Sequence, residues 1–457
     1  MSIDAKRPPN PLGVEPVSKL LLQFSIPAIV GMVIMALYNV VDRIFIGNSP
    51  DIGAIGIGAI ALGMPIMTFM MALGMLIGIG GGALASIRLG EGNPKESEHI
   101  LGNSATAIVL LTAAAAVLFL LFLDPLLRMF GASDEILPYS KDYLRIILAG
   151  SVFGSLTMAM NNFIRVDGRP KTAMLTMALG AGINIVLDPL FIFVFRWGIQ
   201  GAALATILSQ MASTVWVLHY FLGGESRLKL RRRNLPLAPP LVLKVMSIGL
   251  PSFLMQFANT FVIILINARL SLYGGDLAIA AMGIVTSMQM LMIMPILGIN
   301  QGAQPLIGFN YGAGKLDRVK ETLRLAIAAA TIFSVVGFVI IQSMPGLLIR
   351  MFNDDPVLLV LGKDALRFFF LAMPVIGFQI IAASYFQAVG KTRTATFLSL
   401  SRQVIILIPA ILLLSNLFGL YGVFYAPPLS DFLAALISAV FFHREMKHHL
   451  HAPYPSI

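Results

Sequence analysis

The chain has 457 residues, of which 57% are hydrophobic and 12% are charged, and its mean hydropathy is +0.86. Soluble domains carry about 25% charged residues, so this composition excludes a soluble protein and predicts a polytopic membrane protein. The sequence contains no cysteine, which excludes disulfides, thiolate nucleophiles and cysteine-bound metals.

Twelve nearly uncharged runs recur along the chain, each at or above the ~20 residues needed to cross a bilayer. Residues 1–17 are polar and proline-rich and lack the apolar core of a signal peptide, so the first run is predicted to be retained. Most runs are apolar all round, which favours membrane-spanning helices over amphipathic ones. In chain order they are Leu20–Phe45, Ile52–Ile87, Ala105–Leu123, Ile146–Ile164, Thr172–Leu187 with an extension to Phe195, Gly198–Leu222, Val245–Ala268, Leu277–Gly314, Leu325–Ile349, Phe368–Gly390, Phe397–Phe418 and Tyr421–Phe442.

The basic residues are distributed unevenly between the two sides that these spans define. Of the 32 Lys and Arg residues, 22 fall on the side of the N-terminus, 9 fall on the other side, and Arg402 lies within a span. This asymmetry predicts that both termini are cytoplasmic. The net charge of +10 is thereby interpreted as an orientation signal, and nucleic acid is not expected as a partner.

The second half of the chain repeats the first at an offset of about 222 residues. The matching segments are Leu89–Asn93 with Tyr311–Lys315, Lys141–Arg145 with Lys363–Arg367, Arg169–Ala173 with Lys391–Ala395, and Gly198–Gly201 with Gly419–Gly422. Because each half has six spans, both halves share one orientation. We therefore predict an all-α protein of two six-helix lobes, related by a pseudo-two-fold axis along the membrane normal, with a cavity between them.

The predicted organisation is a tail at 1–17, a first lobe at 18–222, a linker at 223–241, a second lobe at 242–443 and a tail at 444–457. Two duplicated lobes around a cavity favour a secondary transporter over a channel, a scramblase or a membrane enzyme. No nucleophile–base constellation supports an enzyme. The linker contains six basic residues when Lys244 is included, and three of them are the consecutive Arg231–Arg233.

Two compositional features of the spans each admit two interpretations. Glycines at four-residue spacing, Gly74, Gly78 and Gly82 and then Gly298 and Gly302, indicate close helix packing, with a hinge as the alternative. Clustered methionines are either ordinary apolar filler or an adaptable cavity wall for varied ligands. The candidate residues of a substrate cavity are Met35, Tyr38, Met64, Gln256, Met288 and Gln289.

Acidic residues within the first lobe predict a cation site. Asn39 and Asp42 are three residues apart, and Asn184 and Asp188 are four apart, so each pair shares one helix face. Pro189 has no N–H, which leaves an additional backbone oxygen available beside Asp188. If the two helices face each other, these oxygens suit a proton or Na⁺. The alternative is that each carboxylate is satisfied locally, with Arg43 as the partner of Asp42.

The second lobe contains one further pair of charges within its spans, Arg402 and Asp431. The simplest interpretation is a structural ion pair between neighbouring helices. A role in substrate binding or coupling is the alternative, since charged residues within spans are frequently functional.

These residues together resemble the multidrug and toxic compound extrusion (MATE) family, and within it the MepA-like bacterial branch. The resemblance covers nearly the whole chain and is carried by Pro27, Tyr38–Gly47, Asn184–Pro189, Gly201–Thr206, Ser401–Gln403 and Pro409. It implies twelve helices in two lobes and a cation-coupled exporter of amphipathic, mostly cationic compounds, in the cytoplasmic membrane of a bacterium or archaeon. It also implies a first-lobe cation site at Asp42, Asn184, Asp188 and Thr206, and a bend of the first helix near Pro27.

The chain departs from part of that family in helix seven, where some members have an acidic residue. Gln256, Asn259 and Thr260 occupy this stretch here, so coupling through the first lobe is favoured. The expected function is export by alternating access in exchange for H⁺ or Na⁺, by a monomer without any other cofactor. A flippase for lipid-linked precursors and a gated channel are the alternatives.

Overall fold

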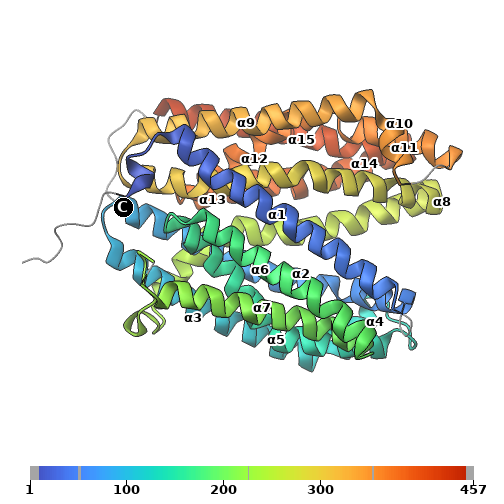
Figure 1. Ribbon diagram of the computed structural model, residues 1–457. Coiled ribbons are helices and arrows are strands. Elements are labelled where there is room, and N and C mark those ends of the chain that lie inside the picture. Colours follow the sequence, from blue (N-terminus) through green and yellow to red (C-terminus); the bar gives the residue numbers. More distant parts are fainter. Residues whose placement is uncertain (1–9, 50–52, 225, 353–354, 449–457) are drawn as a thin grey trace, which may run out of the picture. The chain divides into compact units, whose positions relative to one another are not determined.

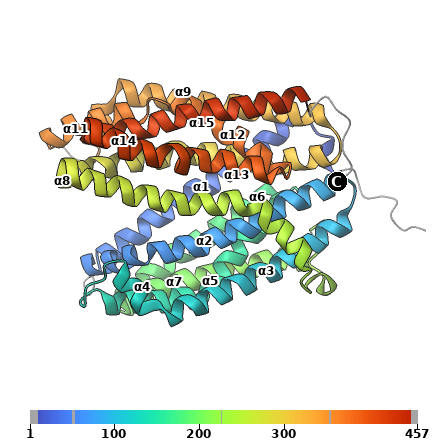
Figure 2. The ribbon, with the colours of Figure 1, turned by 180° about the vertical axis from the view of Figure 1, so that it is seen from behind.

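The computed structural model describes residues 10–49, 53–224, 226–352 and 355–448, and most of them are helical (Figure 1, Figure 2). The side chain of Arg43 lies outside the described residues, as do parts of both predicted tails. In hydrocarbon every backbone polar group must be bonded within the protein, which is why long apolar runs form helices. Helices of the first half are α1 (Val17–Gly47), α2 (Gly53–Gly90), α3 (Pro94–Leu121), α4 (Leu123–Met129), α5 (Leu137–Val166), α6 (Pro170–Pro189), the π-helix η2 (Leu190–Val194) and α7 (Gly198–Leu222).

The second half begins with a single long helical stretch, α8 (Pro239–Gly312), whose backbone departs from helical geometry at Gly275, with φ 61°. This left-handed conformation is accessible to glycine, and it turns the chain between two spans. The remaining elements are α9 (Leu316–Ser343), α10 (Pro345–Arg350), α11 (Pro356–Phe369), α12 (Met373–Ala388), α13 (Thr392–Leu400), the π-helix η4 (Ser401–Leu407), α14 (Ile408–Phe418) and α15 (Leu420–His448). Short 3₁₀ turns, η1 (Pro11–Gly13) and η3 (Arg232–Asn234), precede α1 and α8.

The predicted twelve spans are present in the described part of the chain. Ten helical stretches are long and apolar enough to cross a membrane, and one of them, α8, contains two spans that meet at Gly275. A further span is formed by α11 and α12, which are bent by 45° at a short break. The all-α fold class predicted from hydropathy is therefore confirmed.

The helices form two compact units, one made of Val30–Phe253 and the other of the chain up to Ile29 together with everything from Leu254 onward. We call them the first and second unit. In the first unit α2, α3, α5 and α7 pack together, around buried side chains such as Ile77, Leu144 and Phe163. In the second unit α12 packs on α9 and α15, and α15 also packs on α14.

The division between the units falls inside α1 and α8, whereas the predicted lobes divide at the linker. The reason is close packing at glycines. A Cβ added to Gly298 would lie 2.8 Å from the backbone nitrogen of Ile29. One added to Gly302 would lie 2.7 Å from the backbone nitrogen of Ser25. The beginning of α1 therefore packs closely on the part of α8 that belongs to the second unit. The glycine spacing there serves helix packing, as the first interpretation expected.

The beginning of α8 shows the equivalent arrangement within the first unit. A Cβ on Gly80 would overlap the carbonyl oxygen of Val245, and one on Gly249 would overlap that of Leu76. These contacts leave no room for a side chain at either glycine. The backbone at the start of α8 therefore lies in direct contact with the backbone of α2. Ser25 and Gly249 each lie two residues before a proline, Pro27 and Pro251, which shows that the two crossings are related by the duplication.

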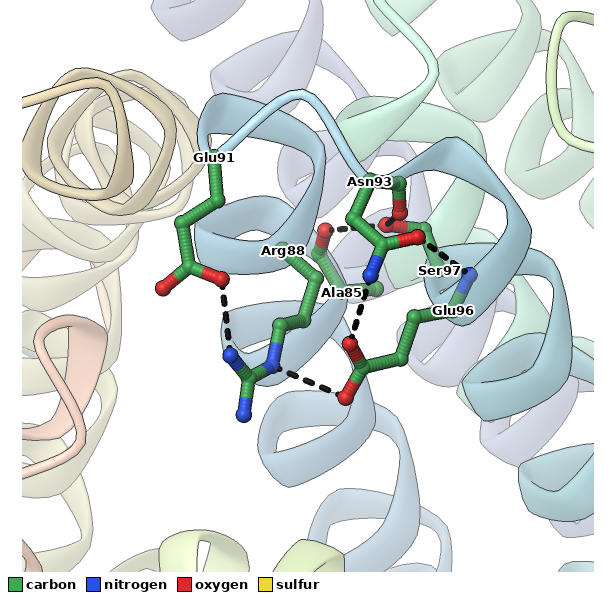
Figure 3. Close-up of polar contacts among 6 residues, drawn as sticks. All are labelled: Ala85, Arg88, Glu91, Asn93, Glu96 and Ser97. Carbon is green, nitrogen blue, oxygen red and sulfur yellow. Dashed lines mark hydrogen bonds and ion pairs between the residues drawn. The ribbon is translucent and has the colours of Figure 1, made fainter. Parts of the chain in front are cut away.

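The repeated G-x-G loops also share a backbone conformation but use different side chains. Gly92 and Gly314 both have positive φ, 78° and 68°, which explains the glycine in each copy. In the first copy Arg88 bonds Glu91 at 2.7 Å and Glu96 at 3.0 Å (Figure 3). In the second copy Lys315 and Arg318 instead donate to backbone carbonyls of the segment around η1, those of Leu12, Gly13 and Glu15.

Candidate functional site

The predicted acidic cluster is assembled within the first unit, from α1, α6 and α7. Tyr38 and Asp42 lie one helical turn apart on α1, and Asn184 and Asp188 lie one turn apart on α6, so each pair presents one face. The carboxyl of Asp188 lies close to the carboxyl of Asp42. The amide of Asn184 donates to Asp188 Oδ1 at 3.2 Å, and the hydroxyl of Tyr38 lies beside Thr206 on α7.

Burial makes the remaining oxygens of this cluster chemically significant. Asp188 is fully buried and Asn184 is 1% exposed. Among the described residues, Asp188 Oδ2 and Asn184 Oδ1 are buried without a hydrogen-bond partner. A buried oxygen without a partner costs roughly 1–3 kcal/mol, and a proton or a metal cation would satisfy it. The arrangement therefore has the character of a cation site.

The contact between the two carboxyl groups has a direct chemical consequence. Two ionised carboxylates in hydrogen-bonding contact repel each other, and neither has a proton to donate. Two carboxyl groups this close together are stable when one of them holds a proton or when a cation lies between them. Pro189 follows directly, and there α6 passes into the wider turn of η2, which places Asp188 at a break in regular helical hydrogen bonding.

Four of the five predicted cation ligands come together, and Asn39 does not join them. Its side chain is exposed, and its amide donates to Met35 O of its own helix at 2.7 Å. Tyr38, which the sequence suggested for the substrate cavity, belongs to the acidic cluster, because its hydroxyl lies near Thr206 and the two carboxyl groups. Its position four residues before Asp42 was the available sequence signal for this placement.

The other predicted cavity residues are dispersed. Met35 and Met64 are exposed in the first unit, by 44% and 40%. In the second unit, Gln256 is half-buried and Met288 is buried in the hydrophobic core. Gln289 lines a cavity of about 10 Å³ together with Asp431 and apolar side chains, a volume that fits roughly one water molecule.

The second unit contains a buried ion pair at a π-helix. Arg402 Nε lies 2.5 Å from Asp431 Oδ1, and both residues are less than 10% exposed. Ser430 Oγ donates to the carbonyl of Arg402 at 2.6 Å, and the neighbouring Gln403 donates to Asn259. The ion pair and the Ser430 bond join η4 to α15, and the Gln403 bond joins η4 to α8.

Comparison with known proteins supplies the family. The MatE family model matches twice, over residues 27–190 and 251–413. The chain belongs to the MatE family. The two matches begin at Pro27 and Pro251, which agrees with the predicted duplication.

Relatives of this MatE chain are multidrug transporters. The multidrug export protein MepA of Staphylococcus haemolyticus is 29% identical over 420 residues, which cover 92% of each chain. The MATE multidrug transporter DinF-BH, whose structure is that of a complex with a ligand, is 39% identical, with a TM-score of 0.89 over 96% of this chain and 98% of that one. An outward-facing MATE transporter at 24% identity shares the fold, with a TM-score of 0.88 and coverage of 95% and 97%.

The predicted MATE resemblance and its twelve-helix, two-lobe architecture are thus confirmed. The chain is a multi-pass membrane protein, and its family and relatives indicate a transporter of small molecules in multidrug export, not an enzyme. The bacterial MepA relatives place such proteins in the cell membrane.

Proposed function

We propose that this transporter exports amphipathic, mostly cationic compounds in exchange for an inward-moving cation, and that the cation binds at Asp42 and Asp188. The observation that carries the proposal is the close approach of Asp42 to the fully buried Asp188, whose Oδ2 has no hydrogen-bond partner among the described residues. The protein would work as a monomer with both termini in the cytoplasm, as the distribution of basic residues predicts.

A proton is the coupling ion that this geometry favours. A proton can be shared by two carboxyl groups that lie this close, without any further ligand. Na⁺ would instead need several oxygen ligands, which Asp42, Asp188, Asn184 and Thr206 would have to provide. Loss of the shared proton would leave two negative charges in contact at a buried position, so protonation and local structure are strongly linked. The alternative ion, Na⁺, is an outcome that the experiment below separates.

Coupling follows from competition for the same negative charge. A cationic substrate is attracted more strongly to the pair without its proton than to the pair that holds one, so each ligand lowers the affinity for the other by the same factor. Protonation from the outside would release the substrate there, and proton release to the cytoplasm would restore substrate binding. Alternating access requires that the two states differ in their affinity for both ligands.

The path from the site to a conformational change is proposed to run along α1. This helix holds Asp42 in the first unit, and its beginning, up to Ile29, belongs to the second unit. Pro27 lies within α1 and removes one helical hydrogen bond, so bending there costs less than elsewhere in the helix. We keep Pro27 as the proposed hinge, and a Pro27→Ala variant should bind substrate but exchange it more slowly.

Cationic cargo is favoured over an anionic lipid-linked precursor by the balance of charges. The first-unit cluster is acidic, and Arg402, the basic residue in the middle of a second-unit span, is already paired with Asp431. A fluorescent lipophilic cation is therefore the first substrate to test, since its efflux can be followed directly.

The test is transport by the purified protein in proteoliposomes. Efflux of the fluorescent cation would be measured with a pH gradient alone and then with a Na⁺ gradient alone. We expect the pH gradient to drive wild-type efflux and Asp188→Asn to abolish it. Asp317→Asn, which neutralises an exposed carboxylate at the start of α9, is the matched control and should transport normally.

Three results would contradict the proposal. Efflux driven only by Na⁺ would overturn the choice of proton, and normal coupling in Asp188→Asn would overturn the site. Ion conductance without substrate coupling, recorded in planar bilayers, would favour a channel.

A further inference from the structure

The segment before α8 is folded against the first unit instead of hanging free as a loop. We call residues 226–238 the linker strap. Its backbone N–H groups at Arg227 and Leu228 donate to the buried carboxylate of Asp167, at 3.0 and 2.8 Å. Burial raises the pKa of Asp167, while the hydrogen bonds that it accepts from the strap and from Tyr220 act in the opposite direction. The strap is thus fastened at the end of α5.

Further along, the strap runs beside the first turns of α3. Glu98, 5% exposed, forms an ion pair with Arg231 at 2.7 Å. The fully buried amide of Asn103 donates to Asn234 O at 3.1 Å and accepts from Ala238 N at 2.7 Å. Thr106 donates to Leu235 O at 2.8 Å. Buried polar side chains of α3 therefore hold the strap in one position.

The sequence of α3 indicates where the strap lies relative to the hydrocarbon core of the membrane. Its last ionisable residue is His99, and residues 100–121 contain none. At 1.5 Å per residue this stretch is about 33 Å long, close to the ~30 Å of a hydrocarbon core. Because Asn234 and Leu235 are bonded to residues 103 and 106, the adjoining arginines lie near the border between headgroups and hydrocarbon.

The exposed side chains of the strap change from cationic to apolar at the same border. Residues 226–238 contain five basic side chains and no acidic one. Arg232 and Arg233 are exposed, and neither has an ion pair with any residue that the structure describes. Leu237 follows at 42% exposure, and Leu243 on the first turns of α8 at 65%. Cationic groups beside exposed leucines match a phosphate group beside an acyl chain.

We propose that Arg232 and Arg233 form a binding site for the phosphate groups of anionic phospholipids, with Leu237 and Leu243 against the acyl chains. The general preference for basic residues in cytoplasmic loops would explain why the strap contains many charges. It would not explain why the strap is held in one position by the buried side chains of Glu98, Asn103 and Asp167. The strap leads directly into α8, so a lipid bound there would hold the beginning of α8 beside α3. This site is independent of the Asp42–Asp188 pair.

The experiment measures lipid binding by the full-length protein in detergent. The midpoint of thermal unfolding would be followed while phosphatidylglycerol or phosphatidylcholine is added. We expect phosphatidylglycerol to raise the midpoint saturably, and phosphatidylcholine to have little effect. Each basic residue near a charged lipid surface is worth about 1 kcal/mol, or roughly fivefold in affinity. Arg232→Gln combined with Arg233→Gln should therefore weaken phosphatidylglycerol binding about 30-fold.

Two further double variants test whether lipid binding depends specifically on the charges of Arg232 and Arg233. Arg232→Lys combined with Arg233→Lys keeps the charge and should bind within a fewfold of wild type, which also shows that substitution here permits folding. Arg324→Gln combined with Arg393→Gln removes two exposed arginines of the second unit and should bind normally. Equal weakening in this control, or unchanged binding in the strap glutamine variant, would overturn the proposal. The same shift produced by inorganic phosphate alone would show that the ligand is free phosphate and not lipid.

Discussion

The two units each bury a small group of ionisable residues in their spans, and the two groups differ in charge. In the first unit Asp42 and Asp188 are two acids in contact, with Asp188 Oδ2 left without a partner. In the second unit Asp431 faces Arg402 at 2.5 Å. Like charges can be held together only by an added cation, whereas opposite charges neutralise each other. The comparison teaches that the first group is suited to load and release a cation, and the second to hold helices in place.

The largest expected effect is on coupling through the acid pair. Asp42→Asn and Asp188→Asn should each reduce efflux driven by a pH gradient to that of protein-free vesicles, because neither variant retains a pair that changes its charge. Arg402→Gln combined with Asp431→Asn should remain coupled, since that variant removes both members of a neutral pair. Loss of coupling in the double variant, measured in the same vesicles, would show that the second group also takes part.

The next largest effect is on stability. Here the ion pair of the second unit is expected to matter more than the acid pair of the first. Arg402→Gln alone should lower the free energy of unfolding by about 3–5 kcal/mol, because it leaves the buried carboxylate of Asp431 without its partner. Adding Asp431→Asn should recover most of that loss. Asp188→Asn should leave the unfolding midpoint unchanged or raise it, since it removes a buried acid that repels Asp42 whenever both groups are ionised. Thermal unfolding in detergent measures all three, and a large destabilisation by Asp188→Asn would break the comparison.

A smaller effect is expected at the edge of the acid pair. Tyr38→Phe removes the hydroxyl that lies beside Thr206 but leaves both carboxyl groups in place. A typical hydrogen bond contributes about 1 kcal/mol, so the apparent affinity for the coupling ion should change by roughly fivefold while coupling persists. The pH dependence of efflux would show this as a displaced midpoint with an unchanged maximum. Complete loss of transport would instead make Tyr38 an essential ligand.

The smallest effect is expected at Asn39. Its exposed amide is bonded to Met35 O on its own helix, so Asn39→Ala should alter stability by no more than about 0.5 kcal/mol and leave coupling unchanged. Efflux assays at several pH values provide the measurement. A clear loss of coupling would mean that Asn39 turns toward Asp42 in another state of the transport cycle.

Much of the fold could be predicted because the signals are local. Span length, the charge asymmetry of the loops and the internal repeat are properties of short segments, and the twelve spans followed from them. The break between α11 and α12 and the π-helical turns at Leu190–Val194 and Ser401–Leu407 were not predicted. Each of them lies beside a proline, Pro374, Pro189 or Pro409, but hydropathy does not indicate how a helix bends or widens there.

The sequence by itself determined the membrane class, the family resemblance and the helix face on which each acid lies, because hydropathy and helical spacing act between near neighbours. Tertiary structure decided which faces meet: it joined Asp42 to Asp188 and Tyr38 to Thr206, and it left Asn39 outside. It also placed the division between the units inside α1 and α8, where glycines such as Gly249 and Gly302 allow backbones to touch. These outcomes depend on contacts between residues far apart in the chain, which no local pattern specifies.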